Sequence, residues 1–204
     1  MYRSTLHSNE AIPQEYRKQA ENLFPKKGFS PNTGPSSKAA AEFANALGIG
    51  TEYKRLLGLP WATNGDGKPE GKIEGKIDDY LENFQYNLDL LIQKTWVEKA
   101  EQTRKEKLQD QVPGFVAGIE KGNYQQALEE FGIILDELAY LFFGTQSTRE
   151  DFAEYTFRID PQMGLFWWYG SQLGRLKEAM KTNQTDNESL WSLLLIGICY
   201  LTNF

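Results

Sequence analysis

The chain has 204 residues, carries 22 Lys and Arg against 28 Asp and Glu for a formal net charge of −6, and is 40% hydrophobic. This length and composition are typical of a folded globular protein, and they exclude a mainly disordered chain. One His and one Cys exclude an intrachain disulfide and a zinc site built from several Cys and His ligands. They also leave a single imidazole, His7, for any catalytic triad.

The first 75 residues contain three predicted helices, which Pro-rich and Gly-rich segments separate. Apolar spacing and an early Pro13 predict a helix over residues 9–24, and three Pro and two Gly make residues 25–35 a connector. A serine N-cap and Gly48 predict a helix from residue 36 or 37 to 47. Thr51 and Gly58 bound a short helix over 52–57, and residues 59–75 form a Gly-rich loop.

The strongest helical pattern begins at Ile77. Apolar residues step by three and four positions as far as Ile92, which predicts one buried face. Beyond Trp96 the pattern gives way to a highly charged run. We expect a solvated continuation of the same helix that ends before Pro113.

A helical hairpin is predicted around Gly122. The segment from Gly122 to Phe131 resembles the middle of a tetratricopeptide repeat over about ten residues, with Tyr124 and Ala127 placed to pack the crossing. No second copy is present in the sequence. The resemblance therefore implies an antiparallel hairpin, with its second helix over 124–143, and not membership of that family.

Three more helices are expected after residue 146. A capping box at Ser147 starts one that runs to about Arg158, Pro161 starts the next, which runs to about 180, and a capping box at Thr185 precedes the last. The apolar run over 190–201 is shorter than the roughly 20 residues that a membrane-spanning helix needs, so we expect a buried helix and no membrane span. The first ten residues lack an apolar run, so the default expectation is a cytoplasmic protein.

Together these elements predict an all-α fold, a multi-helix bundle with an N-terminal helical arm and Pro/Gly-rich connectors. Residues 1–58 would form the arm, 59–75 the loop and 76–204 the bundle core, within one domain overall. Residues 112–204 hold 12 acidic and 6 basic side chains. This imbalance argues against a nucleic-acid surface there, because phosphate contacts need clustered Lys and Arg.

Four consecutive aromatic residues over 166–169 cannot all face one core, because their directions span most of the helix circumference. Trp167 or Trp168 is therefore expected to face a second layer, a ligand or another subunit. The small residues Gly170 and Gly174 would let a neighbouring helix approach closely. The candidate binding residues are Tyr140, Tyr155, Arg158, Trp167, Trp168 and Tyr169.

The same region is rich in carboxylates. Helices can bring such groups together as oxygen ligands for Mg²⁺ or Mn²⁺, which would polarise a phosphoryl group and activate water. The candidate metal ligands are Asp136, Glu137, Glu150, Asp151 and Glu154. Helix capping, first-turn placement and a Glu154–Arg158 surface pair explain most of these acids without a metal.

No complete catalytic constellation is present in the sequence. We therefore expect a non-catalytic helical protein, without a cofactor, that binds a protein partner, a second copy of itself or a small apolar ligand. The alternative is a helical hydrolase of a phosphate ester or nucleotide that uses Mg²⁺ or Mn²⁺.

Overall fold

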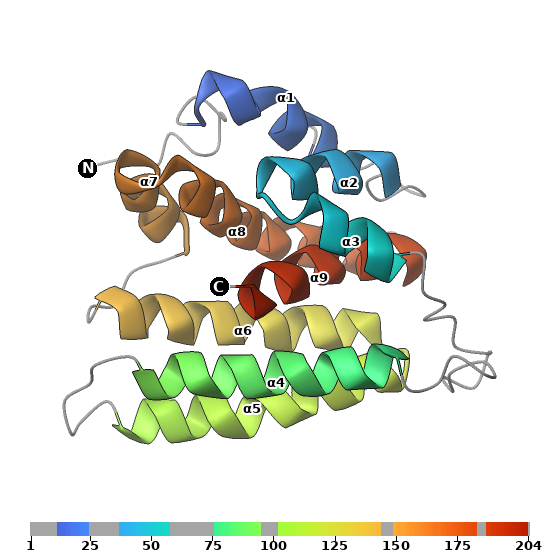
Figure 1. Ribbon diagram of the computed structural model, residues 1–204, viewed down its shortest axis with the longest axis vertical. Helices are drawn as coiled ribbons and strands as arrows, with labels where there is room; N and C mark the ends of the chain where they lie inside the picture. The colour runs from blue at the N-terminus through green and yellow to red at the C-terminus, as the bar shows by residue number, and fades with distance from the viewer. Residues whose placement is uncertain are drawn as a thin grey trace.

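The structure is a computed structural model that describes residues 12–24, 37–57, 76–94, 102–143, 149–182 and 187–203. These residues form nine helices and no strand, which confirms the all-α prediction (Figure 1). The helices are α1 Gln14–Leu23, α2 Ser37–Ala46, α3 Gly50–Leu57, α4 Lys76–Lys94, α5 Gln102–Glu120, α6 Tyr124–Phe143, α7 Arg149–Ile159, α8 Pro161–Thr182 and α9 Asn187–Thr202.

The last helix, α9, lies at the centre of the bundle. Figure 1 shows it between the α1–α3 group and the α4–α6 group, and it contacts α2, α3, α4, α6 and α8. Every residue from Leu190 to Cys199 is buried. A helix that is apolar around its whole circumference is stable only when protein covers it on all sides. The prediction of a buried terminal helix is confirmed.

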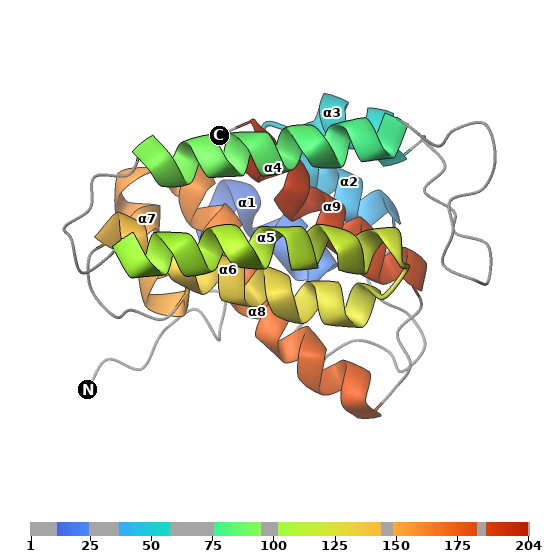
Figure 2. The same cartoon turned by 90° about the horizontal axis from the view of Figure 1, so that it is seen from below.

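Helices α5 and α6 form the antiparallel hairpin that the sequence predicted. Gly122 joins them with a φ of 71°, a left-handed conformation that glycine adopts without steric cost. The two helices approach closely at Gly118, where an added Cβ would lie 3.6 Å from the Cβ of Ala127. Figure 2 shows α4 beside this hairpin, so the three helices form one side of the molecule.

The prediction of one helix from Ile77 to the residue before Pro113 is wrong. Helix α4 ends at Lys94, and α5 packs beside it, with Pro113 inside α5. The expected solvated character holds only in part, because Glu106 and Asp110 are exposed whereas Lys105 and Leu108 are buried. A proline removes one backbone hydrogen bond, but α5 buries an apolar stripe on both sides of it, and tertiary packing supplies most of the stability of such a helix. The stripe is Leu108, Val112, Phe115, Val116 and Ile119.

The N-terminal helices belong to the same hydrophobic core as the rest of the described chain. One cluster of buried residues includes members of all nine helices. The Tyr53 hydroxyl of α3 donates a hydrogen bond of 3.2 Å to the carbonyl of Ser192 on α9. The connector over 25–35 and the Gly-rich loop over 59–75 lie outside the described residues.

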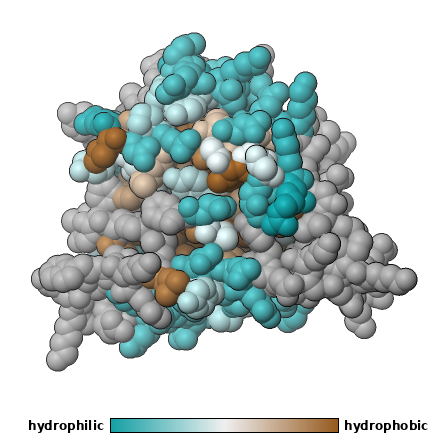
Figure 3. All heavy atoms as spheres, viewed as in Figure 1, coloured by the Kyte–Doolittle hydropathy of each residue, from teal (hydrophilic) through white to brown (hydrophobic). Residues whose placement is uncertain are grey.

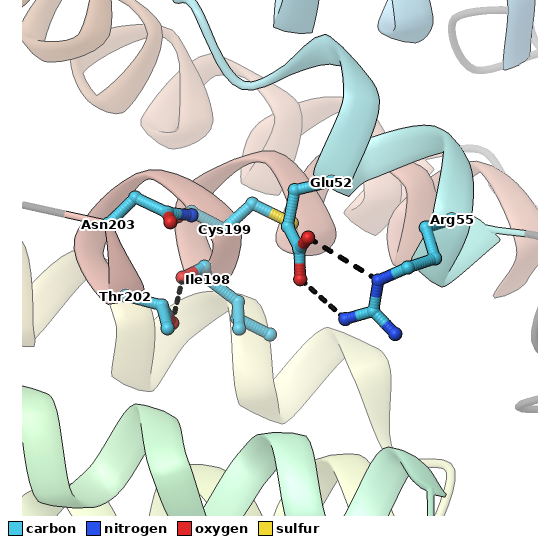
Figure 4. A network of polar contacts seen from close by, with 6 residues as sticks. All are labelled: Glu52, Arg55, Ile198, Cys199, Thr202 and Asn203. Atoms are coloured by element: carbon cyan, nitrogen blue, oxygen red, sulfur yellow. Dashed lines mark hydrogen bonds and ion pairs between the residues drawn. The ribbon is translucent and has the colours of Figure 1, made fainter.

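Polar side chains close the exposed end of α9. The Thr202 hydroxyl donates to the carbonyl of Ile198 at 2.6 Å, and the Asn203 amide donates to that of Cys199 at 2.8 Å (Figure 4). Asn87 of α4 donates to the carbonyl of Thr202 at 3.2 Å. The Cys199 carbonyl also accepts a backbone hydrogen bond from Asn203 at 3.2 Å, and Asn87 supplies a donor to the Thr202 carbonyl, one of those that the last turn of a helix leaves without an intrahelical partner.

The face seen in Figure 3 is mostly hydrophilic where it is coloured, with hydrophobic residues in small separate spots. No helix in the described part of the chain is long and apolar enough to cross a membrane.

Candidate functional site

The aromatic residues of α8 are buried inside the chain. Trp168 packs against Phe24 at the end of α1 and Phe43 of α2, with ring centroids 5.6 and 6.0 Å apart. Trp167 packs edge-to-face against Phe152 of α7 at 4.4 Å. The sequence left open whether Trp167 or Trp168 faces a second layer of helices, a ligand or another subunit. The structure shows a second layer of helices, formed by α1, α2 and α7.

Tyr169 is buried as well, and its hydroxyl donates a hydrogen bond to the carbonyl of Leu193. Burial raises the pKa of Tyr169 far above the usual tyrosine value, and burial does the same to the pKa of Tyr53. These phenols are structural groups that join α8 and α3 to α9. They do not present a polar surface to solvent.

The other candidate binding residues lie nearer the surface. Tyr140 is half-buried on α6, whereas Tyr155 and Arg158 are exposed on the outward face of α7. Arg158 lies 3.8 Å from Glu154, the surface pair that its i, i+4 spacing suggested. Ile159, which was not among the candidates, is 66% exposed beside them.

The candidate metal ligands do not come together in the described part of the chain. Among residues whose side chains are described, no group of three or more His, Cys, Asp or Glu could hold a metal ion. Asp136 instead pairs with Arg149, and Glu154 faces Arg158. Asp151 is exposed and Glu137 is half-buried, while the side chain of Glu150 lies outside the described set.

A pocket with a volume of about 260 Å³ lies between α6, α7 and α8. Helix α6 forms most of it, with Arg149 of α7 and Leu173 of α8 on the other sides. The α6 residues share one face because they form two neighbouring rows, 128, 132 and 136 and then 129 and 133, in which each step of four residues is about one turn. They are Leu128, Glu129, Gly132, Ile133 and Asp136.

Arg149 holds the three helices of this pocket together. Its Nε lies 2.8 Å from Oδ1 of Asp136 on α6, and its Nη1 donates a hydrogen bond of 2.8 Å to the carbonyl of Gly170 on α8. An added Cβ at Gly132 would lie 3.3 Å from Nη1 and 3.5 Å from Nη2. The missing side chain at Gly132 therefore gives the guanidinium room to lie against α6.

The environment of Asp136 is partly desolvated. Burial raises the pKa of Asp136 above the usual aspartate value, the Arg149 guanidinium opposes that increase, and Glu137 adds a smaller increase. The side chain of Asp136 is nevertheless 52% exposed, against 19% for Arg149. The carboxylate is therefore paired on one side and open on the other.

Arg149 and Gly132 are not among the candidate residues that the sequence predicts, although each has a feature in the sequence that could have indicated its role. Arg149 is the first residue of α7, where a positive charge is unfavourable against the helix dipole. Gly132 lies in the interior of α6, where glycine costs about 1 kcal/mol relative to alanine. Both residues are locally unfavourable, and contacts with another helix account for both.

Comparison of the chain with protein-family models, curated proteins and solved structures finds no match.

Proposed function

We propose that this chain is a non-catalytic binding protein whose recognition site is the pocket between α6, α7 and α8. The observation that carries the proposal is the pocket itself, a concavity between three helices that both apolar and charged side chains line. Sites between the helices of a bundle, with a few polar groups that orient the ligand, are common positions for ligand binding.

The arrangement of the charged groups in the pocket supports a binding function better than a catalytic one. Arg149 engages Asp136 and the carbonyl of Gly170, so two of its donor nitrogens already have protein acceptors. A general base needs a carboxylate aimed at a substrate proton, and a nucleophile needs an adjacent activating base. The wall that contains Asp136 and Arg149 instead offers fixed charges beside Leu128 and Leu173.

The exposures of the apolar lining residues suggest how to block the pocket without unfolding the protein. Leu128 and Leu173 are buried, whereas Ile133 is 43% exposed. Ile133→Trp would place a bulky ring over the opening while its backbone stays on the surface. Ile159→Trp introduces the same side chain at another exposed isoleucine, on the outward face of α7, and is the matched control.

The test is a nuclear magnetic resonance screen of small anionic, neutral and cationic probes against amide signals. We expect at least one probe class to cause saturable shifts at Gly132, Ile133 and Leu173. Ile133→Trp should abolish the saturable shifts of Gly132 and Leu173, and Ile159→Trp should leave all three unchanged. A screen in which no class shifts these signals, or in which Ile133→Trp still binds, would remove the proposal.

A further inference from the structure

Helix α7 presents two large hydrophobic side chains to solvent. Among the side chains that the structure describes, the exposed large hydrophobic ones are Tyr86 on α4, Ile133 on α6, and Tyr155 and Ile159 on α7. Tyr155 and Ile159 are 52% and 66% exposed, and their spacing of four residues places them one turn apart on one face. Helix α7 therefore has an outward apolar strip, which the other helices with an exposed hydrophobic residue lack in the described chain.

A loose ion pair lies beside this strip. Arg158 is 73% exposed on its side chain and lies 3.8 Å from Glu154, which is 25% exposed. Charge-assisted hydrogen bonds are about 2.7–2.9 Å long, and an exposed pair at this spacing stabilises a helix by at most about 1 kcal/mol. Both charged groups can therefore exchange this contact for one with another molecule at little cost.

The strip and the ion pair make α7 complementary to a second copy of itself. When two copies of a helix pack antiparallel about a two-fold axis, positions at equal distances on either side of the axis meet. Tyr155 and Ile159 have their midpoint at position 157, and Glu154 and Arg158 have theirs at position 156. One axis near these positions therefore places each apolar residue opposite the other and each charge opposite its opposite, and every contact occurs twice.

We propose that the outward face of α7 is a self-association surface, on which a second copy of this chain docks antiparallel about a two-fold axis. Figures 1 and 2 show α7 at one side of the molecule, where a second copy can approach it. The eleven residues of α7 span about 16 Å at about 1.5 Å per residue. A contact of this length is smaller than the roughly 1,600 Å² of a standard interface, so we expect a weak dimer. This inference goes beyond the ligand pocket and does not depend on it.

Sedimentation equilibrium of the full chain from about 10 μM to about 1 mM, the range of a weak contact, tests the apolar strip. Tyr155→Ser should lower the association constant about tenfold, because it removes both tyrosine contacts of the dimer. Tyr86→Ser, at the exposed tyrosine of α4, is the matched control and should leave the constant unchanged. A chain that stays monomeric at every concentration would leave the strip to a different protein and would overturn the inference, as would equal effects of the two substitutions.

Charge reversal tests the antiparallel arrangement. Arg158→Glu and Glu154→Arg should each lower self-association about fivefold, because each places like charges opposite one another in the dimer. An equimolar mixture of the two variants should recover the wild-type constant, since the positive positions of one protein then face the negative positions of the other. If either variant loses helical content by circular dichroism, Tyr155→Ser still decides. A mixture of folded variants that associates no better than the separate proteins would overturn the inference.

Discussion

Gly197 lies where α6, α8 and α9 meet, and its replacement by alanine tests that packing directly. An added Cβ would lie 2.3 Å from Cζ and 2.5 Å from Cε1 of Phe131, and 3.2 Å from the hydroxyl of Tyr169. Carbon atoms pack favourably at about 3.5–4.0 Å. Phe131 and Tyr169 are fully buried, so neither ring can turn toward solvent to make room.

We expect Gly197→Ala to lower the free energy of unfolding by about 2 kcal/mol. Overpacking a core costs about 1–3 kcal/mol, and the rigid ring of Phe131 places this case at or above the upper end. The greater helix propensity of alanine offsets about 1 kcal/mol of this destabilisation. For a chain of this length, a net loss of that size lowers Tm by about 4–8 °C.

Urea unfolding followed by circular dichroism measures this change. Gly118→Ala is the matched control, because a Cβ there would lie 3.6 Å from the Cβ of Ala127, an ordinary contact. It should stabilise the protein by about 0.5–1 kcal/mol. In a double-mutant cycle, Phe131→Leu should cost less in the Gly197→Ala background than alone. A Gly197→Ala protein as stable as wild type, beside a stabilised Gly118→Ala protein, would refute the packing described here.

Two further predictions concern the partly exposed Arg149–Asp136 pair and the buried tyrosines. Arg149→Met should lower the free energy of unfolding by about 1–2 kcal/mol, because it removes one partly exposed ion pair and one hydrogen bond. The same change should raise the pKa of Asp136 further, because the guanidinium that opposes the increase is gone. A pH titration of the carboxyl resonances measures this pKa, and an unchanged value would contradict the prediction. Because folding raises the pKa of Tyr53 and Tyr169, the neutral phenols stabilise the fold below about pH 10, and this contribution is lost as the pH rises further. Absorbance at 295 nm should show these phenols ionising together with alkaline unfolding, and ionisation well before unfolding would contradict their burial.

Local sequence was enough to define several elements. The helix predicted over 124–143 is α6 with the same limits, because the apolar period and Gly122 act within a few residues. The burial of α9 also follows from its own composition, since an apolar surface on every side needs protein around it. The all-α class follows from the same local signals.

The tertiary structure decided which faces meet. The sequence identified the surplus of aromatic residues in α8 but could not show that Phe24 and Phe43, more than a hundred positions away, cover Trp168. It also could not show that packing would keep Pro113 inside α5. Periodicity indicates that a face is buried, but it carries no information about the partner.

The contacts of the candidate site also could not be predicted from the sequence alone. Asp136 was identified as a carboxylate on a helix, but its pairing with Arg149 depends on how α7 folds back onto α6 and α8. Both Arg149 and Gly132 are unfavourable within their own helices, and only contacts across helices compensate for that cost. The sequence by itself determined most of the helices and the apolar character of α9, but not the division between α4 and α5. Only the tertiary structure decided that Arg149 pairs with Asp136, lies against Gly132 and lines a pocket with them, because these contacts depend on distances between residues that are far apart in the chain.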